Sequence, residues 1–127
     1  MLKNLIYLGF LLSIISCHKE SDCDSHLMGS ISEIDYKDTV QLGSFAIYHL
    51  KVAGFNGCSQ LESITDKVNG KEVIVTGTIY NKGCVCTMVA PFFEGTYTFT
   101  PNSTGTYLIK FTKDLNAVYL VDTVYVK

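Results

Sequence analysis

The sequence predicts an all-β domain, arranged as an antiparallel sandwich or a small barrel. Segments in which apolar and polar residues alternate recur along the chain, separated by turn residues at intervals of about 8–12 residues. After residue 16, no long segment repeats its apolar residues with the period of a helix. The 8 Tyr and 7 Phe, with many Val, Ile and Thr, also favour strands, because these side chains suit a pleated, half-buried surface.

Residues 44–55 form the clearest predicted strand. In an extended chain successive side chains point to opposite faces. Because His49 and Lys51 belong in water, we expect their face to be exposed and the other face to be buried. The exposed set is Phe45, Ile47, His49, Lys51 and Ala53, and the buried set is Ala46, Tyr48, Leu50 and Val52.

Further strands are expected at residues 28–35, 39–42, 59–65, 72–81, 84–86, 95–100, 106–112 and 117–126. Turns are expected at 66–70, 101–105 and 113–116, where Gly, Pro, Asn and Asp gather. Without residues 1–16, the 127-residue chain retains 111 residues, which is enough for one domain. The prediction is therefore a single sandwich of about seven strands.

Residues 1–16 are typical of a secretory signal peptide. Lys3 precedes 11 mostly apolar residues at 5–15, a segment shorter than the roughly 20 residues of a membrane-spanning helix. The following Ile14-Ile15-Ser16-Cys17 resembles the lipobox read by bacterial lipoprotein-processing enzymes. The resemblance implies that Cys17 becomes the mature N-terminus and carries two or three acyl chains, a stable membrane anchor. The alternatives are an ordinary secretory signal that contains a Cys, or a hydrophobic N-terminal strand.

Residues 17–27 are expected to be the lipidated Cys and a short tether, followed by the domain at 28–127. Lys19-Glu20-Ser21-Asp22 partly resembles the surface-export signal of Bacteroidetes lipoproteins, although Ser21 interrupts the acidic residues. His18 stands where an Asp would retain a lipoprotein in the inner membrane. We therefore expect a lipid-anchored protein of the outer membrane, either on the cell surface, which the resemblance favours, or on the periplasmic side.

Four further cysteines, Cys23, Cys58, Cys84 and Cys86, predict two disulfides in an exported chain. On a strand Cys84 and Cys86 share one face, and a bond between them would be strained. One is therefore expected to pair with Cys58 and the other with Cys23; the preferred arrangement is Cys58–Cys84 with Cys23–Cys86. The alternative is a metal site of Cys23, Cys84, Cys86 and His26, which an oxidising compartment disfavours because thiolate ligands must be reduced. No cofactor is expected.

The charge balance argues against a nucleic-acid partner. The mature chain has nine Lys, no Arg and twelve acidic residues, so its net charge is near −3 and it has no basic stripe.

The segment before residue 110 adds detail to the fold. Phe99-Thr100-Pro101 followed by Thr104-Gly105-Thr106-Tyr107-Leu108-Ile109 resembles the corner between strands E and F of immunoglobulin-like domains. The resemblance implies that Tyr107 forms a tyrosine corner, with its hydroxyl on the corner backbone. Antibody domains have a core Cys where this chain has Ile109, and their Trp is absent too, so the resemblance is to immunoglobulin-like sandwiches and not to antibody domains. The alternative is an ordinary hairpin with a Tyr at its start.

Gly57-Cys58, Gly83-Cys84-Val85-Cys86 and residues 98–111 together resemble a group of small uncharacterised Bacteroidetes lipoproteins. That resemblance covers most of the mature chain and implies a fold and a location, but no activity.

The chain also contains no nucleophile elbow, zinc-protease helix motif or phosphate-binding glycine loop. His18, His26 and His49 are scattered, and Glu72 and Glu94 are not spaced as an acid–base pair. We therefore expect a protein that is not an enzyme.

The best candidate for a binding loop is the apolar segment 88–93, with Met88, Pro91, Phe92 and Phe93. Adjacent aromatic residues in an extended chain point to opposite faces, so at least one ring could be exposed, although we favour the interpretation that both rings close the end of the core. Asp38-Thr39-Val40 and Asp122-Thr123-Val124 resemble a Bacteroidetes O-glycosylation site, and modification is favoured at Thr39, near a turn.

Three functions follow from these observations. The first is a non-enzymatic module, anchored to the membrane through Cys17, that binds a protein or glycan partner. The second is an immunoglobulin-like protease inhibitor that uses residues 88–93 or 66–70 as its loop. The third is a thiol- or metal-binding envelope protein that uses Cys84 and Cys86.

Overall fold

The computed structural model describes residues 23–127. They form eight strands, β1 (Ser25–Ile34), β2 (Thr39–Val40), β3 (Ala46–Ala53), β4 (Ser59–Asn69), β5 (Glu72–Asn81), β6 (Phe92–Phe99), β7 (Gly105–Thr112) and β8 (Tyr119–Val126), and no helix in this part of the chain. None of the residues from 23 onward forms a helix long and apolar enough to cross a membrane. The expected signal peptide at 1–16, the lipidated Cys17 and the export signal at 19–22 lie outside the described residues.

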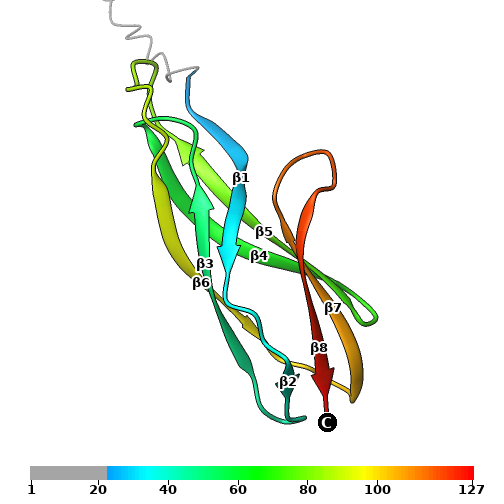
Figure 1. The fold of residues 1–127 in the computed structure, drawn as a ribbon. Coiled ribbons are helices and arrows are strands. Elements are labelled where there is room, and N and C mark those ends of the chain that lie inside the picture. The colour runs from blue at the N-terminus through cyan, green and yellow to red at the C-terminus, as the bar shows by residue number, and fades with distance from the viewer. Residues whose placement is uncertain (1–22) are drawn as a thin grey trace, which may run out of the picture.

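The strands form one continuous sheet that curls into two layers (Figure 1). The order is β2-β8-β7-β5-β1-β3-β6, and β4 pairs with the other edge of β5. This is an all-β sandwich, as the alternating segments predict. The expectation that every pair is antiparallel is wrong, because β2 with β8 and β5 with β7 are parallel. After β5 the chain crosses to the other layer and forms β6. It then returns as β7, which runs in the same direction as β5 and pairs with it in parallel.

β1 belongs to both layers. Its residues 25–29 pair with β5, and its residues 30–34 pair with β3. Gly29 lies opposite Gly77 where β1 leaves β5. A Cβ at Gly29 would lie 2.7 Å from Ile79 Cγ1 and 2.8 Å from Val52 Cγ1, so the missing side chain makes room for Val52 of the facing layer.

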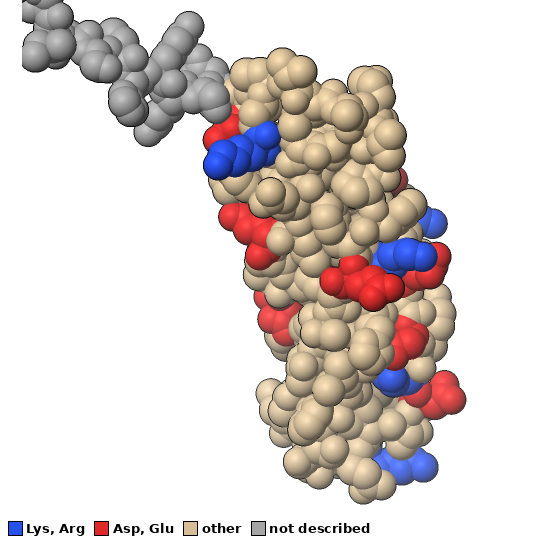
Figure 2. Space-filling model, turned by 90° about the vertical axis from the view of Figure 1, so that its left-hand side faces the viewer, with Lys and Arg blue, Asp and Glu red and all other residues tan. Residues whose placement is uncertain are grey.

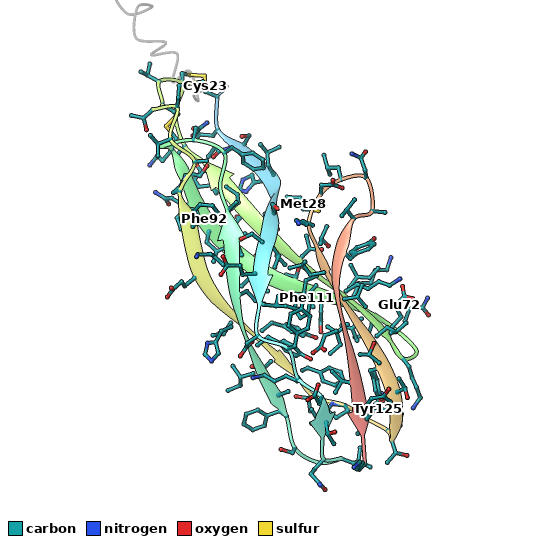
Figure 3. The ribbon with its side chains drawn as sticks, viewed as in Figure 1. Cys23, Met28, Glu72, Phe92, Phe111 and Tyr125 are labelled. Carbon is teal, nitrogen blue, oxygen red and sulfur yellow. A yellow bond between two sulfur atoms is a disulfide. The ribbon has the colours of Figure 1, made fainter. Side chains whose placement is uncertain are left out.

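The core fills the space between the layers, with Phe111 near its centre (Figure 3). The predicted alternation in residues 44–55 is confirmed, because Ala46, Tyr48, Leu50 and Val52 are buried and their neighbours are not. The centroids of the Tyr48 and Phe111 rings are 5.1 Å apart. The other buried side chains include Ile31, Val73, Val75, Ile79, Tyr107, Ile109 and Val124.

Tyr107 has the geometry of a tyrosine corner. Its ring is buried against Phe99, with 5.1 Å between centroids. Its hydroxyl donates to the Asn102 side-chain oxygen at 3.0 Å and lies 3.2 Å from the Ser103 carbonyl oxygen. The side chain thus holds the turn between β6 and β7.

Several predicted boundaries are wrong, and three of them matter for the arrangement of the strands and loops. β1 begins at Ser25, so residues 25–27 pair with β5 and are not part of a tether ending at 27. β4 continues through the predicted turn at 66–70, because a two-residue loop starting at Gly70 (φ 61°) is sufficient to join it to β5. Residues 84–86 form a loop and not a strand; Gly83, with φ 101°, turns the chain just before them.

Candidate functional site

Two disulfides cross-link the end of the sandwich at which the described chain begins (Figure 3). Cys23 is bonded to Cys84 and Cys58 to Cys86, with Cα–Cα distances of 5.0 and 5.4 Å. Cys84 and Cys86 therefore pair with Cys23 and Cys58, as expected, but the preferred arrangement of Cys58–Cys84 with Cys23–Cys86 is wrong. The early start of β1 brings its neighbour Asp24 beside Gly83, whose backbone N–H donates to the Asp24 carboxylate at 2.8 Å, and this places Cys23 next to Cys84.

These bonds use all three thiols that the alternative metal site requires. The fourth candidate ligand, His26, instead lies 2.8 Å from a carboxylate oxygen of Glu62 through its Nδ1 and stacks on Tyr80 with 4.8 Å between ring centroids. Within residues 23–127, no group of three or more His, Cys, Asp or Glu side chains is arranged to hold a metal ion.

Residues 82–91, which we call the tip loop, are held at several points. The backbone N–H of Gly57 donates to the Thr87 carbonyl at 2.9 Å, and that of Gly54 donates to the Pro91 carbonyl at 2.8 Å. At the start of the loop, the Lys82 N–H donates to the Cys58 carbonyl at 3.3 Å. Together with the two disulfides, these bonds fix the tip loop to β1 and to the connection between β3 and β4.

The tip loop exposes apolar side chains. Val85 is 96% exposed, Met88 is 95% exposed, and Val89 is also exposed. Phe92, just after the loop, is 61% exposed, whereas Phe93 packs against the core. The favoured interpretation, that both rings close the core, is therefore wrong for Phe92, because β6 already begins there and turns successive side chains to opposite faces.

A second surface lies on the outside of the layer formed by β1, β3 and β6. Its side chains, which we call the outer face, are Glu33, Phe45, Ile47, His49, Lys51, Phe92, Glu94 and Thr96. A groove of about 700 Å³ crosses this face between Glu33, His49 and Glu94. Phe92 marks the end of the face nearest the tip loop (Figure 3), and Phe45 lies before the first residue of β3 at the other end.

The strand register sets a row of charges across the groove. Lys51 lies opposite Glu94 of β6 and pairs with Glu33 of β1, with Lys51 Nζ 3.4 Å from the Glu33 carboxylate. The same Nζ is 5.6 Å from the centroid of the Phe92 ring. Charged side chains are spread along this side of the molecule; blue and red side chains lie beside the grey residues, whereas the remainder of that end is uncharged (Figure 2).

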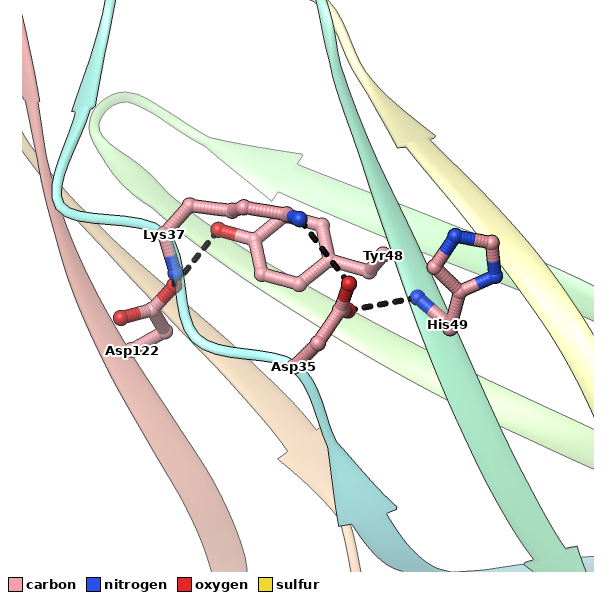
Figure 4. A network of polar contacts seen from close by, with 5 residues as sticks. All are labelled: Asp35, Lys37, Tyr48, His49 and Asp122. Carbon is pink, nitrogen blue, oxygen red and sulfur yellow. Dashed lines mark hydrogen bonds and ion pairs between the residues drawn. The ribbon is translucent and has the colours of Figure 1, made fainter.

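Two carboxylates hold the segment between β1 and β2 (Figure 4). Asp122, buried in β8, accepts hydrogen bonds from the Tyr48 hydroxyl at 2.7 Å and from the Lys37 backbone N–H at 2.8 Å. Asp35 accepts from Lys37 Nζ at 2.9 Å and from the His49 backbone N–H at 2.6 Å. Asp35, the first residue of this segment, therefore lines the groove in a fixed position.

Burial and hydrogen bonding shift two pKa values here. Burial and the bond to the Asp122 carboxylate raise the pKa of the Tyr48 hydroxyl well above its usual 10. Burial alone would raise the pKa of Asp35, but the bonds from Lys37 and the His49 N–H outweigh it and lower the pKa below 3.8. Tyr48 is thus a neutral donor and Asp35 a carboxylate at neutral pH.

The sequence predicted the exposed face of β3 but not the charged side chains that the neighbouring strands add to it. His49 is exposed, as its place in the alternation predicts. Glu94 and Glu72 lie in different layers; Glu72 is 3.3 Å from Lys110. Glu33, Lys51 and Glu94 form a row because their strands pair. The only sign of this row in the sequence is that each residue lies on the outward-facing side of an alternating segment. Asp38 and Thr39 are exposed whereas Asp122 is buried, so modification of Thr39 stays the prediction.

Comparison with known proteins identifies the domain. The comparison with curated proteins and the comparison with solved structures each found no match. Residues 50–126 match the model of the ORF11 beta-sandwich domain, a range that runs from the end of β3 to the end of β8 and covers more than half of the chain. The chain therefore belongs to the family of ORF11 beta-sandwich domains.

Proposed function

We propose that this protein is a lipid-anchored, non-enzymatic module of the bacterial outer membrane that binds a protein partner through its outer face. The anchor rests on residues 1–17, which have the order of a lipoprotein signal. The binding role rests mainly on one observation: three apolar side chains, Phe45, Ile47 and Phe92, are exposed on the same face as an open, charged groove. A face with separated apolar anchors around polar groups is typical of protein interfaces.

The charge of the groove indicates the kind of partner. Its lining includes the carboxylates of Glu33, Asp35 and Glu94 and the ammonium group of Lys51. Because Asp35 is paired with Lys37, the two remaining carboxylates face a single ammonium group. A protein with a basic segment would complement this excess of negative charge and would be steered toward it. Carboxylates also bind the hydroxyl groups of glycans. The tests below therefore distinguish a protein partner from a glycan partner.

The anchor is tested by mass spectrometry of the protein produced from its full chain in a bacterium. We expect the first peptide of the mature protein to begin at Cys17 and to carry the mass of the acyl chains. The variant Cys17→Ser should remain unprocessed or leave the membrane fraction. An unmodified Cys17 in the wild-type chain would contradict the proposed anchor.

The binding face is tested by site-specific photocrosslinking from Thr96, in the groove, with Thr123 on the other layer as control. We expect crosslinks to one protein from Thr96 and none from Thr123. Phe45→Ala with Phe92→Ala should remove the crosslink, whereas Tyr125→Ala, which removes a half-exposed ring from β8, should preserve it. Equal crosslinking by all variants excludes this face, and binding of the chain to a glycan array that Phe92→Ala abolishes assigns the face to a glycan.

A second candidate is an immunoglobulin-like protease inhibitor. The supporting observation is the tip loop, which exposes Val85 and Met88 and is held by two disulfides near its start and by backbone hydrogen bonds at Thr87 and Pro91. A loop fixed in this way loses little entropy when it enters a protease cleft. A panel of cysteine and serine proteases tests it: inhibition that Met88→Asp abolishes supports this function, and no inhibition of any protease contradicts it.

A further inference from the structure

The exposed apolar residues of the tip loop lie at the end of the domain from which the anchor would emerge. The described chain begins at Cys23, which is bonded to Cys84 inside the tip loop. Cys23 lies at the end of the molecule where the grey trace joins it (Figures 1 and 3), and the C-terminus is at the opposite end. Any anchor attached before Cys23 therefore leaves the domain at the tip loop.

The length of chain before Cys23 limits the distance between tip loop and anchor. Cys23 is six positions downstream of Cys17, and a fully extended segment of that length spans about 20 Å. The Cys23–Cys84 bond allows no additional length, because it fixes Cys23 to the loop itself. An acylated Cys17 thus keeps Val85 and Met88 within reach of the lipid surface.

The chemistry of the tip suits a lipid surface. Residues 83–93 and 54–58, which form most of this end, contain no charged residue. The Asp24 carboxylate lies beside the start of the loop, where it accepts the Gly83 N–H. Val85 and Met88 are almost fully exposed, and most of the Val89 side chain is exposed. Phe55, in the connection between β3 and β4, is about half exposed. Lys82 is exposed at the base of the loop, where an ammonium group can meet lipid phosphates.

We propose that the tip loop inserts Val85, Met88 and Val89 into the head-group region of the membrane, so that the sandwich stands on its disulfide-linked end. This inference rests on the proposed lipid anchor. The loop needs little ordering on insertion because the two disulfides and the bonds from Gly54 and Gly57 already fix it. In this orientation the groove of the outer face points sideways, and Phe45 lies far from the lipid.

The absence of Trp from the chain allows a direct test. Met88→Trp places the only Trp on the tip, and Phe45→Trp places it at the opposite end, where Phe45 is 59% exposed. The lipidated full-length products, purified in detergent, are reconstituted into vesicles of equal parts phosphatidylethanolamine and phosphatidylglycerol, with and without brominated acyl chains. We expect Met88→Trp emission to shift to shorter wavelength and to lose about half or more of its intensity in brominated vesicles, because an interfacial side chain lies about 5–10 Å deep. Phe45→Trp emission should not change.

The controls separate the two proposals. Val85→Trp, at an equally exposed position, should reproduce the result if Met88→Trp folds poorly. Lipidated protein whose Met88→Trp and Val85→Trp emissions are unquenched overturns the tip inference and leaves the anchor intact. An unmodified Cys17 overturns both. A shift that appears only when an outer-membrane protein extract is added assigns the tip loop to a protein and overturns lipid contact.

Discussion

The hydroxyl of Tyr48 on β3 donates a 2.7 Å hydrogen bond to the carboxylate of Asp122 on β8 and so links the two layers of the sandwich through a buried polar contact. The same carboxylate oxygen accepts the backbone N–H of Lys37. The segment between β1 and β2 is therefore fixed to the core by a group that is itself 4% exposed.

Removal of this hydroxyl should destabilise the fold. In Tyr48→Phe the ring still packs on Phe111, but the buried Asp122 carboxylate loses one of its donors. We expect a loss of about 1–3 kcal/mol in the free energy of unfolding, measured by urea denaturation. Tyr125→Phe, which alters a half-exposed side chain on β8, is the matched control and should leave stability unchanged. Equal stability of Tyr48→Phe and wild type would show that the contact contributes nothing.

Asp35 should make stability depend on pH in the acid range. Its pKa is lower in the folded protein than its usual 3.8, so the stabilisation is complete above that value and is lost as the pH falls below it. Because the side chain is partly exposed, the effect should stay below about 1 kcal/mol. Urea denaturation at pH 6 and pH 3 should show a larger loss for wild type than for Asp35→Asn. An identical pH dependence of the two proteins would exclude Asp35 as the source.

The disulfides should contribute strongly to stability. Peptide mapping without reduction should find Cys23 linked to Cys84 and Cys58 linked to Cys86. Cys58→Ser with Cys86→Ser removes a link across 28 residues, which should lower the free energy of unfolding by about 3–4 kcal/mol. The tip loop should then become sensitive to limited proteolysis, whereas Cys23→Ser with Cys84→Ser should release the chain before β1 and preserve the link to Cys58. Mapping that finds Cys23–Cys86 contradicts the structure directly.

The crossing of β1 between layers should depend on Gly29. A methyl group there would lie within 3 Å of Ile79 and Val52, so one of these side chains would have to move. We expect Gly29→Ala to lower the melting temperature and to cost about 1–3 kcal/mol, the usual range for an overpacked core. Val52→Ala in the Gly29→Ala background makes room for the methyl group and should cost less than it does alone. A melting temperature of Gly29→Ala equal to that of wild type would contradict this close packing.

The turn between β6 and β7 should weaken without the Tyr107 hydroxyl. Tyr107→Phe retains the ring against Phe99 but loses the bonds to Asn102 and the Ser103 carbonyl. A loss of about 1 kcal/mol in urea denaturation is expected. Tyr119→Phe provides a tyrosine control on β8. If both variants lose the same free energy of unfolding, the hydrogen bonds of the Tyr107 hydroxyl do not stabilise the turn.

The sequence predicted most accurately those elements whose alternation is set by burial alone. The expected bounds of β5 at 72–81 are those observed, because nearly every second residue there faces the core. The predicted strand at 59–65 ends too early because Asp66, Asn69 and Gly70 are turn-forming residue types. In the structure β4 continues to Asn69, and the Asp66 carboxylate accepts a hydrogen bond from the Tyr97 hydroxyl at 2.6 Å. Pairing partners are not encoded in local pattern: the parallel contact of β5 with β7, the disulfide arrangement and the row of Glu33, Lys51 and Glu94 all depend on segments distant in sequence.

The bond between Cys23 and Cys84 also determines how the domain carries mechanical load. A force that pulls on the chain before Cys23 would, without this bond, act on the first residues of β1 and open its pairs with β5 one at a time, starting at Ser25. With the bond, the force divides between β1 and the loop at Cys84, which the neighbouring Cys86–Cys58 bond connects to the start of β4. Tension is thus shared by three segments of the sandwich, and the strand that joins its two layers is protected from being peeled away.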